Sequence, residues 1–155
     1  MKIKGPWNAS QIRSHLEASL IPARLAVLTP SGSPLVLSLW FLPRDGAIWC
    51  ACNKRARVID LLREDPRCGF EVASEIPPYR GVRGQGQAWL DAPEGPAVLE
   101  QLLARYRIAA GSRLAGMLRS ESANEVAIRI VPDWMTSWDF SARMRDAFSP
   151  QGRGD

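Results

Sequence analysis

Residues 47–72 read AIWCACNKRARVIDLLREDPRCGFEV, and the organisation of the chain is clearest from this segment. Its first six residues, Ala47 to Cys52, predict a β-strand, and Asn53 can cap the helix that follows. The apolar positions of that helix take up helical spacing, at Val58, Ile59, Leu61 and Leu62. Pro66 ends the helix, because proline lacks the amide hydrogen that a helix needs. Arg67 to Ala73 then predicts another strand.

The charges of this predicted helix oppose its dipole. Lys54, Arg55 and Arg57 crowd its first turn, whereas Glu64 and Asp65 stand at its end. A helix dipole prefers anions at the N-terminus and cations at the C-terminus, each worth about 0.3–1 kcal/mol. A bound phosphate would remove the conflict, because backbone N–H groups and the cations would surround it. A solvated basic turn without a ligand explains the composition equally well.

The residues before this segment predict one helix and two strands. Apolar residues recur at every fourth position over residues 9–20, which is typical of a helix. Strands are predicted over residues 24–29 and 35–42, and turn-forming residues at 30–33 and 43–46 follow them. Two hairpins in a row favour an antiparallel meander.

The residues after it complete a mainly β protein. Strands are predicted over 82–90, 126–131 and 134–140, the last two split by Pro132, and helices over 93–106 and 111–119. Six or seven strands joined by short turns and a few helices imply a closed or nearly closed barrel, with an open antiparallel sheet as the alternative. We expect a single domain over residues 1–148 and a disordered polar tail over 149–155.

The composition is that of a globular protein, with 46% apolar and 23% charged residues. The formal net charge of +4 suits an anionic ligand but is too small to predict nucleic-acid binding. No segment has the roughly 20 apolar residues of a membrane-spanning helix. The basic N-terminus lacks the apolar run of a signal peptide, so we expect a cytoplasmic protein that binds neither membrane nor nucleic acid.

The cysteines and the single histidine narrow the possible chemistry. Three cysteines, Cys50, Cys52 and Cys68, with no export signal argue against disulfides and favour buried structural thiols. A metal site needs further ligands, and the only histidine, His15, is far away in a predicted helix. We therefore predict no metal site. One histidine also leaves a hydrolytic triad without an obvious base.

Three segments, in the right order, resemble the pyridoxamine 5′-phosphate oxidase-like FMN-binding split barrels. Residues 47–72 are similar to that family's FMN-phosphate segment. Residues 79–90 (YRGVRGQGQAWL) resemble its Arg-x-Val-Arg-x-x-Gly strand, and residues 126–144 (VAIRIVPDWMTSWDFSARM) its closing hairpin. The resemblance covers about residues 22–145. It implies a six- or seven-stranded antiparallel split β-barrel that forms a homodimer, with FMN at the subunit interface.

The resemblance also implies which residues hold the phosphate. Arg57 falls where the family places an arginine on the FMN phosphate, and Lys54 and Arg55 lie in the same turn. Cys52 and Asn53 fall where the strand end meets the phosphate and the ribityl chain. The cysteine stands where a hydroxyl residue is common in the family.

The remaining implied contacts surround the flavin ring. Ser38 and Trp40 lie on the strand that borders the ring, and Arg80 begins the strand that passes under its other side. Trp138 matches a tryptophan that reaches the flavin of the neighbouring subunit, and Arg143 follows it as a second contact. Tryptophans such as Trp40 more often serve core or interface packing.

Two departures from the family pattern affect the expected substrate. The family's oxidases carry a hydroxyl–basic–basic run where this chain has Ala56-Arg57-Val58, so one hydroxyl and one cation are missing. Their closing Arg-x-His-x-Arg motif, which grips pyridoxal phosphate, is replaced by residues 141–145 (SARMR). We therefore do not expect this protein to oxidise pyridoxamine phosphate.

The predicted function is that of an FMN-dependent oxidoreductase acting on a small-molecule substrate. No side chain demands a role as general acid or base, because the flavin itself carries the chemistry. The alternatives are a non-catalytic flavin-binding protein, or a protein of the same fold that binds a deazaflavin coenzyme or haem. Haem needs an axial ligand, and His15 is a poor candidate.

Overall fold

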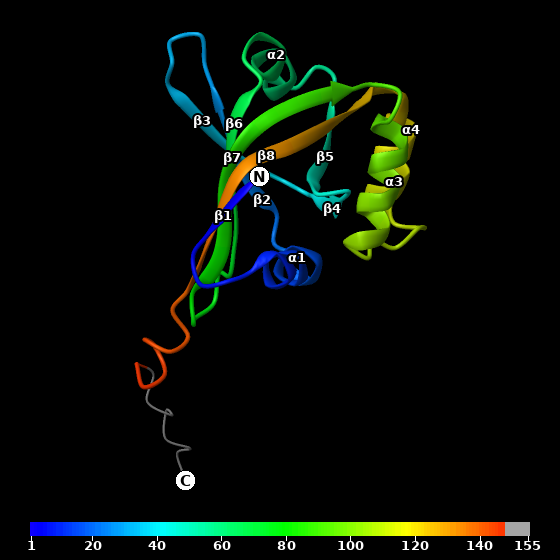
Figure 1. The fold of residues 1–155 in the computed structure, drawn as a ribbon. Coiled ribbons are helices and arrows are strands. Elements are labelled where there is room, and N and C mark those ends of the chain that lie inside the picture. Colours follow the sequence, from blue (N-terminus) through cyan, green and yellow to red (C-terminus); the bar gives the residue numbers. More distant parts are fainter. Residues whose placement is uncertain (148–155) are drawn as a thin grey trace.

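A computed structural model describes residues 1–147 as one curved β-sheet surrounded by helices (Figure 1). The strands are β1 (Lys2–Lys4), β2 (Ala23–Leu28), β3 (Pro34–Leu39), β4 (Leu42–Arg44), β5 (Ala47–Asn53), β6 (Arg67–Ala73), β7 (Arg80–Asp91) and β8 (Glu125–Asp139). The helices are α1 (Ala9–Ala18), α2 (Arg57–Glu64), α3 (Gly95–Arg105) and α4 (Arg113–Ser120), and a 3₁₀ turn (Ser122–Asn124) precedes β8. The predicted tail, residues 149–155, lies outside the described residues.

The strands follow the order β3-β2-β6-β7-β8-β5-β4, with all neighbours on this path antiparallel, and β1 adds in parallel to β8. The two edge strands, β3 and β4, are consecutive in the chain, and only Trp40 and Phe41 separate them. Three peptide steps, from Leu39 to Leu42, span at most about 11 Å. The sheet must therefore curl until its edges approach each other, which makes it a split barrel and confirms the predicted fold class.

This arrangement corrects the predicted meander. The apolar run at residues 35–42 is two strands at opposite edges of the sheet, not one strand. The two predicted hairpins do form: β2 pairs with β3, and β4 pairs with β5 through a turn at Asp45 and Gly46, both with positive φ. An Asp-Gly pair suits such a turn. The hairpins are not neighbours in the strand order, because β3 and β4 stand at its opposite ends.

The closing pair of strands predicted around Pro132 is a single strand, β8. Gln85 pairs with Trp134 and Gly86 pairs with Pro132, so Asp133 is the extra residue of a β-bulge. A bulge accommodates proline, because the missing amide hydrogen is not needed there. The long antiparallel pair of β7 and β8 runs the length of the barrel (Figure 1).

Two apolar clusters stabilise the barrel. The larger fills its interior, where the buried residues of α2 join Ile128 and Ile130 of β8. The smaller lies on the other side of β5 and β8, where Val98 and Leu102 of α3 pack on Trp49. Among residues 1–147, no helix is long and apolar enough to cross a membrane.

We expect Gly86→Ala to lower the free energy of unfolding by about 1–3 kcal/mol, the usual cost of overpacking. A Cβ at position 86 would clash with the carbonyl oxygen of Val131, which is backbone of the adjacent strand. Gly116→Ala is the matched control, since nothing lies within 4 Å of its added Cβ in α4. That variant should gain about 0.5–1 kcal/mol. Chemical denaturation measures both, and equal stability of the two variants would contradict the bulge geometry.

Candidate functional site

The N-terminus of α2 has no side chain that caps it. Its N-cap residue is Ala56, which makes no side-chain hydrogen bond. The helices α1 and α4, by contrast, are capped by Asn8 and Ser112. Asn53, the predicted cap, lies too early in the chain, and its side-chain oxygen accepts from the backbone N–H of Arg55 at 3.0 Å. The first backbone N–H groups of α2 therefore lack a side-chain acceptor.

Three cations stand beside this uncapped end. The side chains of Lys54, Arg55 and Arg57 are exposed, and none makes an ion pair with any residue in the range 1–147. The backbone N–H of Lys54 donates to the carbonyl oxygen of Asn124 at 2.7 Å, which ties the turn to the start of β8. The basic turn, residues 54–57, thus carries uncompensated positive charge on a fixed backbone.

One of the two acidic residues at the end of α2, Asp65, is compensated, which the sequence pattern did not reveal. Asp65 forms an ion pair with Arg67, and the shortest N–O distance is 2.6 Å. Hydrogen bonds from Arg67 hold the pKa of Asp65 at about 2. At this end of α2 only Glu64 has no ion pair with a residue in the range 1–147, whereas none of the three cations at the N-terminus has one.

A buried carboxyl lies next to the basic turn, and sequence analysis missed it. Glu125 opens β8 and pairs in register with Asn53 at the end of β5. Its side chain is buried, and burial raises its pKa. Burial and the nearby Glu125 also raise the pKa of the half-buried Cys52 thiol. Nothing in the sequence marks Glu125, because its burial depends on the packing of α3 against β8.

Three further predicted ring contacts, Arg80, Trp138 and Arg143, lie at or beyond the end of the β7–β8 strand pair that is remote from the basic turn. Arg80 pairs with Asp139, and Trp138 pairs with Gly81. Arg143 lies 5.5 Å from the ring of Phe140. Trp138 is 13 residues along β8 from Glu125, which is about 40 Å of strand. A single chain therefore does not bring Trp138 and Arg143 to the basic turn.

The side chains of Ser38 and Trp40 lie in different surroundings. Ser38 is exposed on the outside of β3, where it is in register with Arg24. Trp40 lies between β3 and β4, and its ring stacks on Tyr106 with 5.0 Å between centroids. The Trp40 ring thus packs against the end of α3 as part of the smaller apolar cluster.

Ser38 belongs to what we call the outer face of the sheet. Two rows of paired residues cross it: Ser38, Arg24, Glu71, Arg83 and Thr136, and next to them Val36, Ala26, Gly69, Gln85 and Trp134. A shallow hollow of about 520 Å³ lies over these rows. The small residues Ala26 and Gly69 form its floor, and charged side chains surround it. The sequence signal for this face was the alternation of polar residues along residues 83–87.

No cluster of three or more metal-ligating side chains occurs within residues 1–147. His15 is engaged elsewhere: its Nε2 lies 3.0 Å from the carbonyl oxygen of Val72, and its ring lies 5.0 Å from that of Trp7. Cys50 and Cys68 are buried, and burial raises the pKa of Cys68 to about 12. These residues serve the packing of the barrel.

Several solved structures are similar to this chain in fold. A conserved hypothetical protein of Mycobacterium tuberculosis is 24% identical with a TM-score of 0.74, over 97% of this chain and 94% of that one. An F420 reductase is 19% identical with a TM-score of 0.69, over 84% of this chain and 97% of that one. A candidate pyridoxamine 5′-phosphate oxidase of Listeria innocua is 18% identical with a TM-score of 0.65, over 83% of this chain and 95% of that one. No protein-family model and no curated protein matched the sequence.

Proposed function

This chain has the split-barrel fold of the pyridoxamine 5′-phosphate oxidase-like proteins, and we propose that it is an FMN-dependent oxidoreductase that acts as a homodimer. The observation that carries the proposal is the basic turn at the uncapped N-terminus of α2. A phosphate there would accept hydrogen bonds from the free backbone N–H groups and offset most of the charge of the three cations.

The residues of the basic turn fit a phosphate monoester. Arg57 is the first residue of α2 and would bind the phosphate, assisted by Lys54 and Arg55. Asn53 and Cys52 precede them at the end of β5, where the ribityl chain would follow. Bound FMN would supply hydride transfer to or from a small molecule. The role of the protein is to orient the ring and exclude water.

A homodimer would complete the site. Trp138, near the end of β8, and Arg143, which follows that strand, lie too far from the basic turn of their own chain to reach a nucleotide there. A second copy that packs on the outer face would bring its own Trp138 towards that nucleotide. The hollow over the outer face and the exposed Val36, 63% accessible, favour this face as the contact surface.

A deazaflavin coenzyme is the second candidate ligand, since one of the similar structures is an F420 reductase. Haem is disfavoured because His15 is held between Val72 and Trp7. The substrate proposed is a small molecule other than pyridoxamine phosphate. Met144 stands between Arg143 and Arg145, where the specific oxidases place a histidine.

Anaerobic mixing with NADPH or NADH tests whether the bound flavin is catalytic. We expect the flavin absorption band to bleach and to return when an electron acceptor is added. If the flavin stays oxidised with both NADPH and NADH, the result favours a non-catalytic flavin-binding protein.

Cysteine alkylation tests the placement of Cys52. In the native protein, iodoacetamide should modify Cys52 and leave Cys50 and Cys68 unmodified, because those two thiols are buried and Cys52 is half-exposed. Peptide mass spectrometry measures the modification at each site. Saturating FMN should slow the reaction of Cys52. An unchanged rate would remove this residue from the FMN site.

A further inference from the structure

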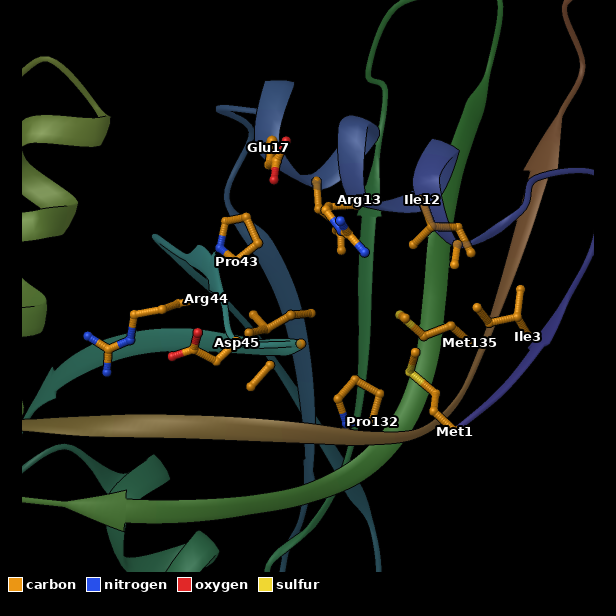
Figure 2. Close-up of a pocket in the computed structure, with 15 residues that line it drawn as sticks. Met1, Ile3, Ile12, Arg13, Glu17, Pro43, Arg44, Asp45, Pro132 and Met135 are labelled. Atoms are coloured by element: carbon orange, nitrogen blue, oxygen red, sulfur yellow. The ribbon is translucent and has the colours of Figure 1, made fainter.

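A second cavity lies on the opposite side of β8 from the outer face. It has a volume of about 350 Å³ and opens between α1, the β4–β5 turn and β8 (Figure 2). Its floor is made of buried apolar side chains, among them Ile12, Leu16, Ile48 and Met135. Small-molecule sites are typically mostly apolar hollows of about 300–1,000 Å³ with a few polar groups. This cavity therefore has the size and lining of a site for a small ligand.

Helix α1, which contributes Ile12 and Leu16 to the cavity, is fixed in position at both ends. The guanidinium of Arg105, on α3, donates to the carbonyl oxygens of Leu16 and Ser19, both at 2.7 Å, and of Glu17 at 3.0 Å. These bonds satisfy carbonyls at the C-terminus of α1, where a cation is favourable. At its other end α1 is fixed by the capping box of Asn8 and Gln11. Helix α1 thus cannot easily slide inward and fill the cavity.

One cation at the cavity is free to bind a ligand. Arg13 makes no ion pair with any residue in the described range, and Figure 2 shows its guanidinium extending from α1 towards the cavity. Arg44 is already engaged by Glu94 at 2.9 Å and by the ring of Trp49, 3.8 Å away. In Figure 2 its guanidinium points away from the cavity.

Two acidic residues also line the cavity. Figure 2 shows the carboxylate of Asp45 turned towards the side of Arg44, away from the cavity. Glu17 lies one helical turn after Arg13, at the rim. Arg13 is therefore the charged group best placed to meet a ligand whose apolar part lies on the floor.

We propose that this cavity binds a small apolar molecule that carries a single carboxylate, with the apolar part on Ile12, Leu16 and Met135 and the carboxylate on Arg13. The site is separate from the proposed flavin site. Met135 faces the inside of the sheet, whereas Trp134 and Thr136 belong to the outer face. Ala47, at the cavity, is also six residues along β5 from Asn53, which is about 20 Å. The proposal goes beyond the proposed oxidoreductase and does not depend on FMN.

Octanoate is the probe, and the methionine methyl groups report where it binds. The protein has four methionines, of which Met1 and Met135 line the cavity and Met117 and Met144 do not. In NMR spectra of methyl-labelled protein, octanoate should shift the Met1 and Met135 signals and leave the other two unchanged. Unshifted Met135 at saturating octanoate, or equal shifts of all four signals, would overturn the proposal.

The charge preference is tested with probes of equal length. Octanoate should bind more tightly than octanol and octylammonium, and Arg13→Gln should weaken octanoate binding by about fivefold or more without affecting octanol. Arg113→Gln, on the exposed first turn of α4, is the control that removes the same charge elsewhere. Octylammonium binding as tightly as octanoate, or equal octanoate affinity of the two variants, would contradict the role of Arg13.

Discussion

Arg57→Ala is expected to weaken FMN binding by about ten- to a hundredfold. A hydrogen bond to a charged group contributes about 1.5–3 kcal/mol, and each 1.4 kcal/mol is a factor of ten in affinity. Arg57 is exposed and makes no ion pair with a described residue, so the substitution removes no contact that stabilises the fold. Titration of flavin fluorescence measures the loss directly.

Arg113→Ala is the matched control for this variant. Both arginines are the first residue of an eight-residue helix, Arg57 in α2 and Arg113 in α4. The difference lies in the cap, because the Ser112 hydroxyl accepts from the N–H of Ala115 at 3.1 Å, whereas Ala56 offers no such group. FMN affinity should be unchanged in Arg113→Ala. Equal affinities of the two variants would reject the basic turn as the phosphate site.

Val36→Asp should convert the protein to a monomer and abolish tight FMN binding. Val36 stands on the outer face, where we propose that the second copy packs. A carboxylate buried there without a partner costs at least about 3 kcal/mol, so the dimer dissociation constant should rise by more than about a hundredfold. Light scattering and flavin titration on the same sample measure both effects.

Met117→Asp distinguishes an effect of this face from a general effect of surface charge. Val36 is 63% exposed and Met117, on α4, is 57% exposed, so both substitutions place a carboxylate at a similarly accessible apolar site. Only the first should alter the oligomeric state. If Val36→Asp remains a dimer with FMN bound, the outer face is not the interface.

Local patterns predicted the segments of the fold well, because each depended on neighbours in the chain. The strand over Arg67 to Ala73 has its predicted bounds, and the helix before Pro66 begins within one residue of its first predicted apolar position. The number of strands and the short turns predicted a closed or nearly closed barrel with an open sheet as the alternative, and the family resemblance specified the split barrel. The segments follow from periodicity and from proline and glycine positions.

Long-range features were not predictable in the same way. The apolar run at residues 35–42 reads as one strand, and only the curl of the sheet separates β3 from β4. Pro132 reads as the end of a strand, but the bulge opposite Gly86 lets β8 continue through it. The burial of Glu125 and the stacking of Trp40 on Tyr106 depend on where α3 packs, which no local pattern specifies.

The site itself was predictable only in part. The charge pattern of residues 53–65 fitted an anion site and a solvated basic turn equally well, and the uncapped helix end favours the anion site. The distance between Glu125 and Trp138 could not be predicted from the sequence, because Pro132 suggested two short strands where the structure has one long strand. That distance is the physical reason for proposing that two chains share each flavin.

Titration of the apo-protein with FMN, with light scattering on the same samples, tests the central claim most directly. We expect one FMN bound per chain, on a species with twice the 17.2 kDa chain mass. A species of 17.2 kDa that binds FMN, or a dimer that binds no FMN, would contradict it.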